Sequence, residues 1–190
     1  MDSAGITGVI LAGGLGRRMG GADKGLQLLA GKSLVQWVAE RFAPQVNSLL
    51  INANRNPDAY AALGYPVFAD TIPNFAGPLA GLHAALAAAR QPLVAMVPCD
   101  SPHLPRDLVA RLRAQLEANR ADVAIATDGH RPHPVFCLCR RSVLPRLESY
   151  LAGGGRKVMH WCATIGAVQV AFADQPDAFR NFNTPEDLES

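Results

Sequence analysis

The sequence predicts an α/β protein: one Rossmann-like, three-layer domain over residues 1–190, with helices on both faces of a doubly wound, mostly parallel sheet. Three observations lead to this fold class. Short apolar segments alternate with segments of helical periodicity along the whole chain. A length of 190 residues corresponds to a single domain. The apolar content of 49% is sufficient to fill a core.

The expected strands are short apolar segments that end in polar or turn-forming residues. The segment 92–97 is almost entirely apolar, which is typical of a parallel strand buried on both faces. In chain order, strands are expected at 6–11, 46–51, 66–69, 92–97, 123–127, 135–139 and 168–172.

The expected helices begin at capping residues or near a proline. Ser33 and Thr184 are suitable N-caps, and Pro78 is tolerated in a first turn. Leu79, Leu82 and Leu86 share one helix face, so they are expected in the core. In chain order, helices are expected at 33–43, 60–63, 79–89, 106–118, 141–150 and 157–162, with a short last helix after Thr184.

The charge and hydropathy patterns exclude several classes of protein. The formal net charge is only +2, which argues against a general nucleic-acid binder. The chain opens without the charged and then apolar pattern of a signal peptide. The longest apolar helix candidate, 79–89, is too short to span a membrane. We therefore expect a soluble, cytoplasmic protein that acts as a monomer, without membrane or nucleic acid as a partner.

The four cysteines are expected to be inert thiols in the core. Cys137 and Cys139 alternate within an apolar, strand-like segment, and neither Cys99 nor Cys162 completes a metal-binding spacing with them. His130 and His133 lie near the pair in sequence, but the paired spacing typical of zinc sites is missing.

A glycine-rich, basic segment over residues 13–24 directly follows the first apolar segment. Glycine lets the backbone approach a bulky ligand closely. Arg17, Arg18 and Lys24 add cationic donors that suit phosphate oxygens. The combination of a strand with such a loop predicts a site for a nucleoside triphosphate.

Two common phosphate-binding motifs are almost present in this part of the chain, and both fail. The dinucleotide motif requires glycine at position 19, where Met19 stands, and Gly20 comes one residue late. The P-loop motif would end in Gly31-Lys32-Ser33, but Leu26 stands where its first glycine is required.

Polar residues follow several of the expected strands. Asn52, Asp70 and Asp100 come directly after the second, third and fourth strands, as the glycine-rich segment does after the first. Ligands of parallel sheets bind beyond the carboxyl ends of the strands, so these groups are expected to converge. A carboxylate at a strand end, such as that of Asp100, suits Mg²⁺. Structural roles are also open: Asp100 as a helix cap, and Asn52 as a turn residue.

The same residues resemble a family motif: Leu11-Ala12-Gly13-Gly14, then Arg18-Met19-Gly20, Asp23-Lys24 and Gly31-Lys32-Ser33-Leu34. It is similar to nucleotidyltransferases that join a nucleoside monophosphate to a phosphorylated acceptor, and most of all to molybdenum cofactor guanylyltransferases. The resemblance implies transfer of GMP from GTP to the molybdopterin that carries molybdenum, with Mg²⁺ as cofactor. The products would be the guanine dinucleotide cofactor and pyrophosphate.

The resemblance also implies roles for individual residues. The implied catalytic residues are Arg18, Lys24 and Asp100, and Asp100 is also the implied metal ligand. The implied contacts with the acceptor are Arg156, Asn181 and Asn183. The implied nucleotide contacts are Leu11, Ala12, Gly13, Gly14, Lys24, Asn52, Asp70, Gly77 and Asp100.

Two other functions stay open at this stage. A cytidylyltransferase or a sugar-phosphate nucleotidyltransferase would use the same loop, although such relatives more often carry alanine where Gly13 stands. A nucleotide-sensing module would bind without turnover. Proteins that deliver the pterin, and acceptor molybdoenzymes or their chaperones, are further partners that the resemblance implies.

Overall fold

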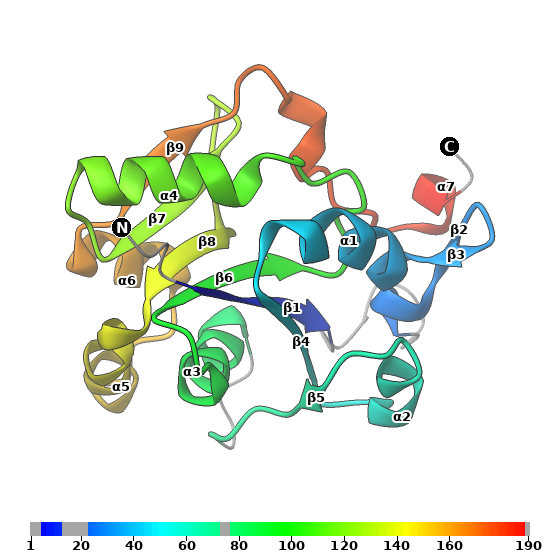
Figure 1. The fold of residues 1–190 in the computed structure, drawn as a ribbon, viewed down its shortest axis with the longest axis horizontal. Helices are drawn as coiled ribbons and strands as arrows, with labels where there is room; N and C mark the ends of the chain where they lie inside the picture. The colour runs from blue at the N-terminus through cyan, green and yellow to red at the C-terminus, as the bar shows by residue number, and fades with distance from the viewer. Residues whose placement is uncertain (1–4, 13–22, 73–76, 189–190) are drawn as a thin grey trace.

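The computed structural model describes residues 5–12, 23–72 and 77–188, and it places seven strands in one mixed, mostly parallel sheet (Figure 1). Their spatial order is β5-β4-β1-β6-β8-β7-β9. Only β8 runs against its neighbours β6 and β7; the other pairs are parallel. The bounds are β1 Ile6–Ala12, β4 Ser48–Ala53, β5 Val67–Phe68, β6 Leu93–Pro98, β7 Val123–Thr127, β8 Pro132–Arg140 and β9 Val168–Ala171.

Helices cover both faces of this sheet, which confirms the expected doubly wound α/β class (Figure 1). On one face, α1 and α4 pack through residues such as Phe42 and Leu112. On the other, α3, α5 and α6 pack through Leu82, Leu147 and Trp161. The bounds are α1 Leu34–Phe42, α2 Pro57–Ala61, α3 Pro78–Ala88, α4 Leu108–Ala118, α5 Leu144–Ala152, α6 Val158–Ile165 and α7 Pro185–Leu188.

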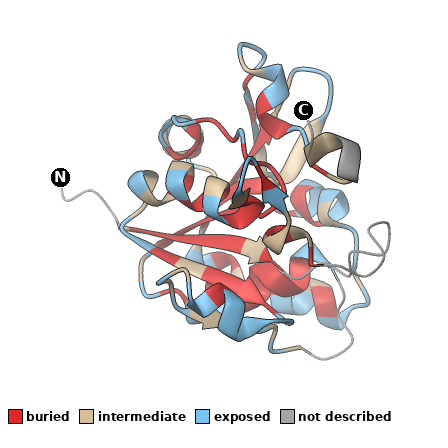
Figure 2. Ribbon diagram, turned by 90° about the vertical axis from the view of Figure 1, so that its right-hand side faces the viewer, coloured by how far each residue is buried: buried red, intermediate tan, exposed pale blue. Residues whose placement is uncertain are grey.

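The core consists of two layers of apolar side chains, one on each face of the central strands. Ile10 of β1 belongs to one layer and Val9 to the other, and both are fully buried. Figure 2 shows the buried residues concentrated in the strands and on the helix faces that meet them. The expected stripe Leu79, Leu82 and Leu86 is buried in the second layer, as predicted.

Ser33 is the N-cap of α1, as predicted, with a capping box in which its backbone N–H donates to Gln36 Oε1 at 2.9 Å. Several strand bounds differ from the prediction, and two of the differences bear on the site. The second strand runs to Ala53, so Asn52 lies inside β4 and not after it. The strand expected at 135–139 begins at Pro132. Prolines 132 and 134 lack backbone donors and obscured this start in the sequence.

The segment Gly31-Lys32-Ser33 belongs to a small hairpin and not to a phosphate loop. Ala30 and Gly31 have φ values of 51° and 80°, which form the tight turn between β2 (Leu28–Leu29) and β3 (Lys32–Ser33). Lys32 pairs with Glu40 on the protein surface. Short 3₁₀ helices complete the chain at η2 Lys24–Leu26, η3 Ala43–Gln45, η4 Arg141–Val143 and η5 Pro176–Phe179.

All four cysteines are free and buried, as expected for core thiols. Burial raises the pKa of the Cys162 thiol to about 12. Among the described residues, no cluster of three or more His, Cys, Asp or Glu side chains could hold a metal ion. No helix in the described ranges has the length and apolar character needed to cross a membrane.

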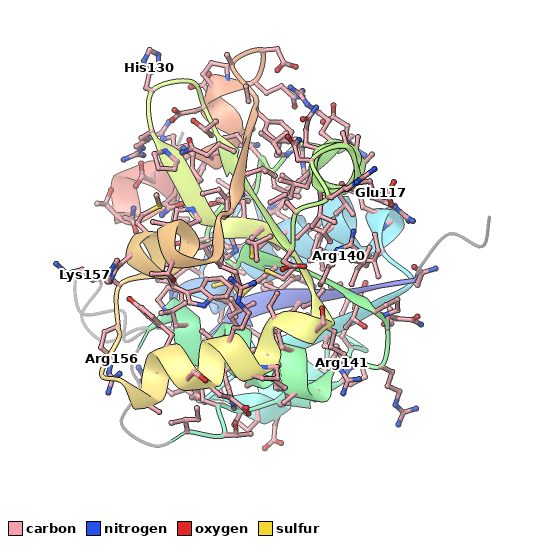
Figure 3. All side chains as sticks on the ribbon, turned by 90° about the vertical axis from the view of Figure 1, so that its left-hand side faces the viewer. Glu117, His130, Arg140, Arg141, Arg156 and Lys157 are labelled. Carbon is pink, nitrogen blue, oxygen red and sulfur yellow. The ribbon has the colours of Figure 1, made fainter. Side chains whose placement is uncertain are left out.

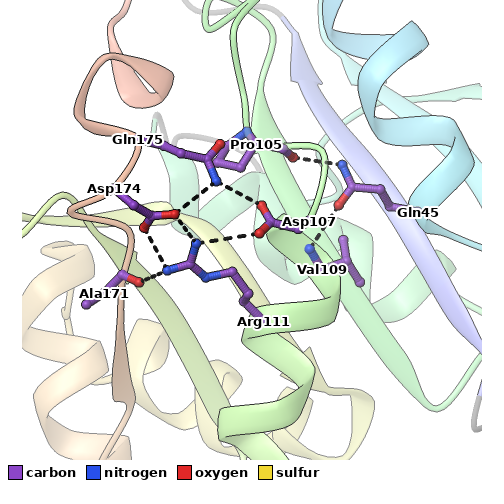
Figure 4. Close-up of polar contacts among 8 residues, drawn as sticks. All are labelled: Gln45, Pro105, Asp107, Val109, Arg111, Ala171, Asp174 and Gln175. Atoms are coloured by element: carbon purple, nitrogen blue, oxygen red, sulfur yellow. Dashed lines mark hydrogen bonds and ion pairs between the residues drawn. The ribbon is translucent and has the colours of Figure 1, made fainter.

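After β9, the chain is tied to α4 and then returns across the carboxyl ends of the strands. Arg111 of α4 makes a bidentate pair with Asp174, at 2.8 and 3.0 Å (Figure 4). Gln175 in turn donates to Asp107 at 3.2 Å. Beyond η5, the backbone N–H of Phe182 donates to the carbonyl of Asp100 at 2.8 Å. These contacts bring residues 179–183 to the end of β6.

Candidate active site

A cavity of about 730 Å³ lies at the carboxyl ends of β1, β4 and β6, where a parallel sheet is expected to bind its ligand. This volume is in the range of nucleotide-sized sites. One wall is made by Leu11, Ala12, Asn52, Asn54, Asp70, Gly77, Pro78 and Gly81. Lys24, Pro98, Cys99 and Asp100 form its floor. The opposite wall is made by Arg131, Pro132, His133, Pro134, Val135, Phe136, Phe179 and Asn181.

Lys24 and Asp100 face each other at the floor of the cavity, although 76 residues separate them in sequence. Lys24 Nζ lies 3.5 Å from Asp100 Oδ2. The same ammonium donates a hydrogen bond to Asn183 Oδ1 from the C-terminal segment. Both side chains are mostly buried, so solvent screens this charge pair less than a surface pair. Three distant parts of the chain therefore meet at one ammonium group.

The second carboxylate oxygen of Asp100 is buried and has no hydrogen-bond partner among the described residues. An unpartnered buried carboxylate oxygen is costly, and it is unusual in folded proteins. Burial raises the pKa of Asp100, and the charge of Lys24 opposes that rise. A hard oxygen donor beside a phosphate-sized cavity is the ligand type that Mg²⁺ prefers, so Asp100 fits a magnesium site.

A cluster of amides and a carboxylate lines the β4 side. Asn52 Nδ2 donates to Asp70 Oδ1 at 3.1 Å, and Asn54 Nδ2 donates to Asp70 Oδ2 at 2.9 Å. The backbone N–H of Asp70 returns a bond to Asn54 Oδ1 at 2.8 Å. Gly81 of α3 lies beneath it, where an added Cβ would come within 2.9 Å of Asn52 Oδ1. The cluster offers both donors and acceptors to a planar ligand edge.

The opposite wall is aromatic and partly cationic. The ring of His133 stacks on Phe179 with centroids 4.8 Å apart and planes at 17°. Its Nε2 lies 2.9 Å from Asp128 Oδ2. Backbone N–H bonds from Arg131, together with His133 and the N–H of His130, hold the pKa of Asp128 well below its usual range. A register shift between Ile125 and Ala126 of β7 disrupts the ladder opposite this wall, as a β-bulge does.

Most of the predicted site residues that the structure describes meet at this cavity. Leu11, Ala12, Lys24, Asn52, Asp70, Gly77, Asp100 and Asn181 line it. Asn183 reaches it through its contact with Lys24. Gly13, Gly14, Arg17 and Arg18 lie outside the described residues.

The structure does not place Arg156 among the lining residues. It lies between α5 and α6, and its guanidinium donates to the carbonyls of Leu151 and Gly155. Figure 3 shows it near Lys157, on the side of the molecule away from Arg140 and Arg141.

Sequence analysis missed Asn54 and the whole wall from Arg131 to Phe136 with Phe179. The run Asn52-Ala53-Asn54 carries a usable signal for Asn54, because alternate residues of a strand share one face. The wall gives no such signal, because it requires the direction of β8 to be known.

The fold and this cavity together define a nucleotidyltransferase-type domain, and residues 8–168 match the MobA-like NTP transferase domain family. Among nucleotidyltransferases, the chain is similar in sequence to molybdenum cofactor guanylyltransferases. A molybdenum cofactor guanylyltransferase of Cupriavidus necator is 52% identical over 188 residues, which cover 96% of this chain and 94% of that protein. One of Haemophilus influenzae is 43% identical over 183 residues, with 96% and 95% covered. The chain belongs to the molybdenum cofactor guanylyltransferase family.

Solved structures share the fold. Molybdopterin-guanine dinucleotide biosynthesis protein A of Archaeoglobus fulgidus superposes with a TM-score of 0.79 at 24% identity, covering 96% of this chain and 95% of that one. A CMP:2-keto-3-deoxy-manno-octonic acid synthetase complexed with CTP has a TM-score of 0.74 at 18% identity, with 98% and 96% covered. At these identities, the likeness describes the fold alone.

Proposed function

We propose that the chain transfers GMP from GTP to the molybdopterin of the molybdenum cofactor, forming the guanine dinucleotide cofactor and pyrophosphate. The observation that carries this proposal is the Lys24–Asp100 pair at a nucleotide-sized cavity, together with Asp100 Oδ1, which no residue in the described ranges hydrogen-bonds. Membership of the guanylyltransferase family supplies the donor and the acceptor. We expect the reaction to take place in the cytoplasm.

The proposed reaction is a displacement at the α-phosphorus of GTP. An oxygen of the acceptor phosphate forms a bond to this phosphorus, and the bond to the β-phosphate oxygen breaks as pyrophosphate leaves. Such a step depends mainly on positioning and on charge stabilisation. Lys24 is proposed to hold phosphate oxygens with its ammonium group, and Arg18 to add a second cationic contact. Asn183 and Asp100 fix the direction of the Lys24 side chain.

Asp100 is the proposed magnesium ligand. Its buried Oδ1, which has no partner within the described part of the chain, fits a hard divalent cation, and the adjoining cavity has room for phosphate oxygens and waters as further ligands. Mg²⁺, when bound, supplies positive charge to the phosphate oxygens. The chain contributes the carboxylate of Asp100, and the ammonium group of Lys24, 3.5 Å from Asp100 Oδ2, adds a second positive charge beside the phosphates.

The two walls of the cavity are proposed to take the two substrates. Leu11, Ala12, Asn52, Asp70 and Gly77 would contact the nucleotide, with Gly13 and Gly14 from the preceding loop. The opposite wall, with the His133–Phe179 stack and the guanidinium of Arg131, suits a flat heterocycle that carries a phosphate. Asn181 lines the cavity on that side, and Arg156 stays a weaker candidate. Proteins that deliver the pterin, and molybdoenzymes that accept the product, are proposed as partners.

Pyrophosphate release tests this function directly. The protein is incubated with Mg²⁺, molybdopterin that carries molybdenum, and each of GTP, CTP, ATP and UTP in turn. We expect release with GTP and with no other nucleotide. Turnover with CTP but not GTP would indicate a cytidylyltransferase. Tight GTP binding without turnover on this acceptor or on sugar phosphates would indicate a binding module.

A further inference from the structure

Asp23, which directly precedes Lys24 in the sequence, is held by hydrogen bonds from three other residues. Its side chain is buried, and its carboxylate accepts three hydrogen bonds from neutral groups. Oδ1 accepts from the Tyr60 hydroxyl at 2.5 Å and from the backbone N–H of Gly25 at 3.2 Å. Oδ2 accepts from Asn56 Nδ2 at 3.0 Å. We define Asp23, Asn56 and Tyr60 as the Asp23 cluster.

We infer that the Asp23 cluster is a positioning device: it fixes the backbone at Lys24 so that the ammonium group reaches the phosphates at the floor of the cavity. The inference rests on the proposed function, because it assigns Lys24 to phosphate oxygens. Asp23 itself touches no substrate in this scheme. It acts through Lys24.

The local structure explains why Lys24 needs this support. Lys24 opens η2, a 3₁₀ helix of only three residues, and so short a helix is not stable by itself. Lysine also has a long, flexible side chain, so its ammonium is placed accurately only if the backbone beneath it is fixed. Asp23 caps this helix and ties it to Asn56, the N-cap residue just before α2, and to Tyr60, the fourth residue of α2.

Close packing supports the same conclusion. A Cβ at Gly25 would lie 2.5 Å from the Tyr60 hydroxyl oxygen and 3.2 Å from Cys99 Sγ. Residue 25 is therefore pressed between α2 and the residue that precedes Asp100. Tyr60 is fully buried, and its hydroxyl donates its hydrogen bond to Asp23. Movement of Asp23 would shift Lys24 relative to Asp100.

The contrast between the two aspartates separates their roles. Both oxygens of Asp23 accept hydrogen bonds, whereas Asp100 Oδ1 has no partner among the residues that the structure describes. A buried carboxylate with all its bonds made inside the protein is suited to hold structure. One with an oxygen left open is suited to bind a ligand. Asp23 thus belongs to the support of the site, and Asp100 to its reacting centre.

The test measures the affinities for GTP and for guanosine, together with kcat and KM, in Asp23→Ala, Asp23→Asn and Tyr60→Phe. Tyr60→Phe keeps the buried ring and removes one hydrogen bond, so we expect a loss of about 2- to 10-fold in GTP affinity and in kcat/KM. Asp23→Ala removes all three bonds and should cost about 30-fold or more. Asp23→Asn should keep GTP affinity and kcat/KM close to those of the wild type. The asparagine oxygen can still accept from Tyr60 and Gly25, and the Asn56 amide can turn so that its oxygen accepts from the new NH₂ group.

Guanosine separates positioning from general damage, because it lacks phosphates. We expect its affinity to stay unchanged in all three variants. Equal losses for GTP and guanosine would overturn the inference, and so would wild-type GTP affinity in Asp23→Ala. An Asp23→Asn variant as poor as Asp23→Ala would also contradict it, because charge and not geometry would then matter.

Tyr65→Phe is the matched control, since it removes a tyrosine hydroxyl just after α2 and leaves in place the three hydrogen bonds that Asp23 accepts from Gly25, Asn56 and Tyr60. It should match the wild type in every measurement. Binding does not require turnover, so the outcomes of the two proposals are distinct. A wild type that binds GTP and releases no pyrophosphate would contradict the proposed function while leaving the binding test of Asp23 decisive.

Discussion

The two halves of the sheet reach the cavity in opposite ways. In the parallel half, β5, β4, β1 and β6, the strands deliver residues at or just beyond their carboxyl ends, such as Asn52, Asp70 and Asp100. In the other half, β8 runs the opposite way, so its first residues, 132–136, arrive at the same edge. Strand direction therefore decides which end of a segment becomes part of the site.

The halves also differ in chemistry. The parallel half presents carboxylates and amides, and Asp100 Oδ1 among them has no hydrogen-bond partner in the described ranges. The β8 half presents stacked rings of His133 and Phe179, with Arg131 at its margin. A site for two different substrates needs such unlike walls, since a triphosphate with a metal and a flat heterocycle are recognised by different groups.

The largest effect is expected at the floor of the parallel half. Asp100→Asn keeps the shape and removes the charge, so we expect kcat to fall about 100-fold or more, as when other preorganised charge stabilisers are lost. The melting temperature should stay equal or rise, because the neutral amide is less costly to bury than the carboxylate. Activity assays and thermal unfolding check both. A clear loss of stability would mean that Asp100 is primarily structural.

Gly81→Ala tests the nucleotide wall by steric means. The new Cβ would lie 2.6 Å from Leu11 Cδ2 and 2.9 Å from Asn52 Oδ1, so both lining residues must move. We expect GTP to bind about tenfold more weakly, with acceptor KM unchanged. Gly153→Ala is the control, because its Cβ would make only ordinary contacts, at 3.4 Å or more. Titration with GTP decides the outcome; wild-type affinity would exclude a nucleotide on this wall.

His133→Ala tests the opposite wall. The change removes a ring from the wall proposed for the acceptor, and an aromatic contact with a flat heterocycle contributes about 1 kcal/mol, so we expect the acceptor KM to rise about fivefold. The KM for GTP should remain that of the wild type. Steady-state kinetics with each substrate varied in turn measures both values. A rise confined to GTP would reverse the assignment of the two walls.

The smallest effect concerns the chain segment that carries Phe179, Asn181 and Asn183. The bidentate bond from Arg111 lowers the pKa of Asp174 to about 2. The backbone N–H of Asn183, then Arg180 and the N–H of Thr184, lower the pKa of Asp187 to about 2. Carboxylates with depressed pKa values stabilise the fold above their unfolded value near ~3.9, and this contribution disappears as pH falls toward 2.

We therefore expect the melting temperature to fall between pH about 4 and 2, in part through these two groups. Asp174→Asn should flatten this part of the profile, because its bond to Arg111 no longer titrates. Melting curves at a series of pH values measure the effect. If the melting temperatures of the variant and the wild type fall in parallel as the pH is lowered, the Arg111–Asp174 pair does not contribute to the loss of stability in acid.

Much of the site could be predicted because parallel strands place their ends together. Asp100 was predicted from its place after the fourth strand and Lys24 from the glycine-rich basic segment after the first, and the structure brings their charged groups to 3.5 Å. Asn52 was found for a partly wrong reason, since it lies within β4 and reaches the cavity by its register beside Leu11. Arg156, which the resemblance suggested, stays a prediction: it is not among the lining residues, and its guanidinium donates to the carbonyls of Leu151 and Gly155.

The sequence by itself determined the alternation of strands and helices and most of the polar residues at the carboxyl ends of the parallel strands, because hydrophobic periodicity, caps and strand ends are local properties. Only the tertiary structure decided the direction of β8, the wall that it builds and the contacts from Asn183 to Lys24 and from Tyr60 to Asp23. Those contacts join residues 159 and 37 positions apart. No local pattern encodes them, since they depend on how separately formed elements pack together.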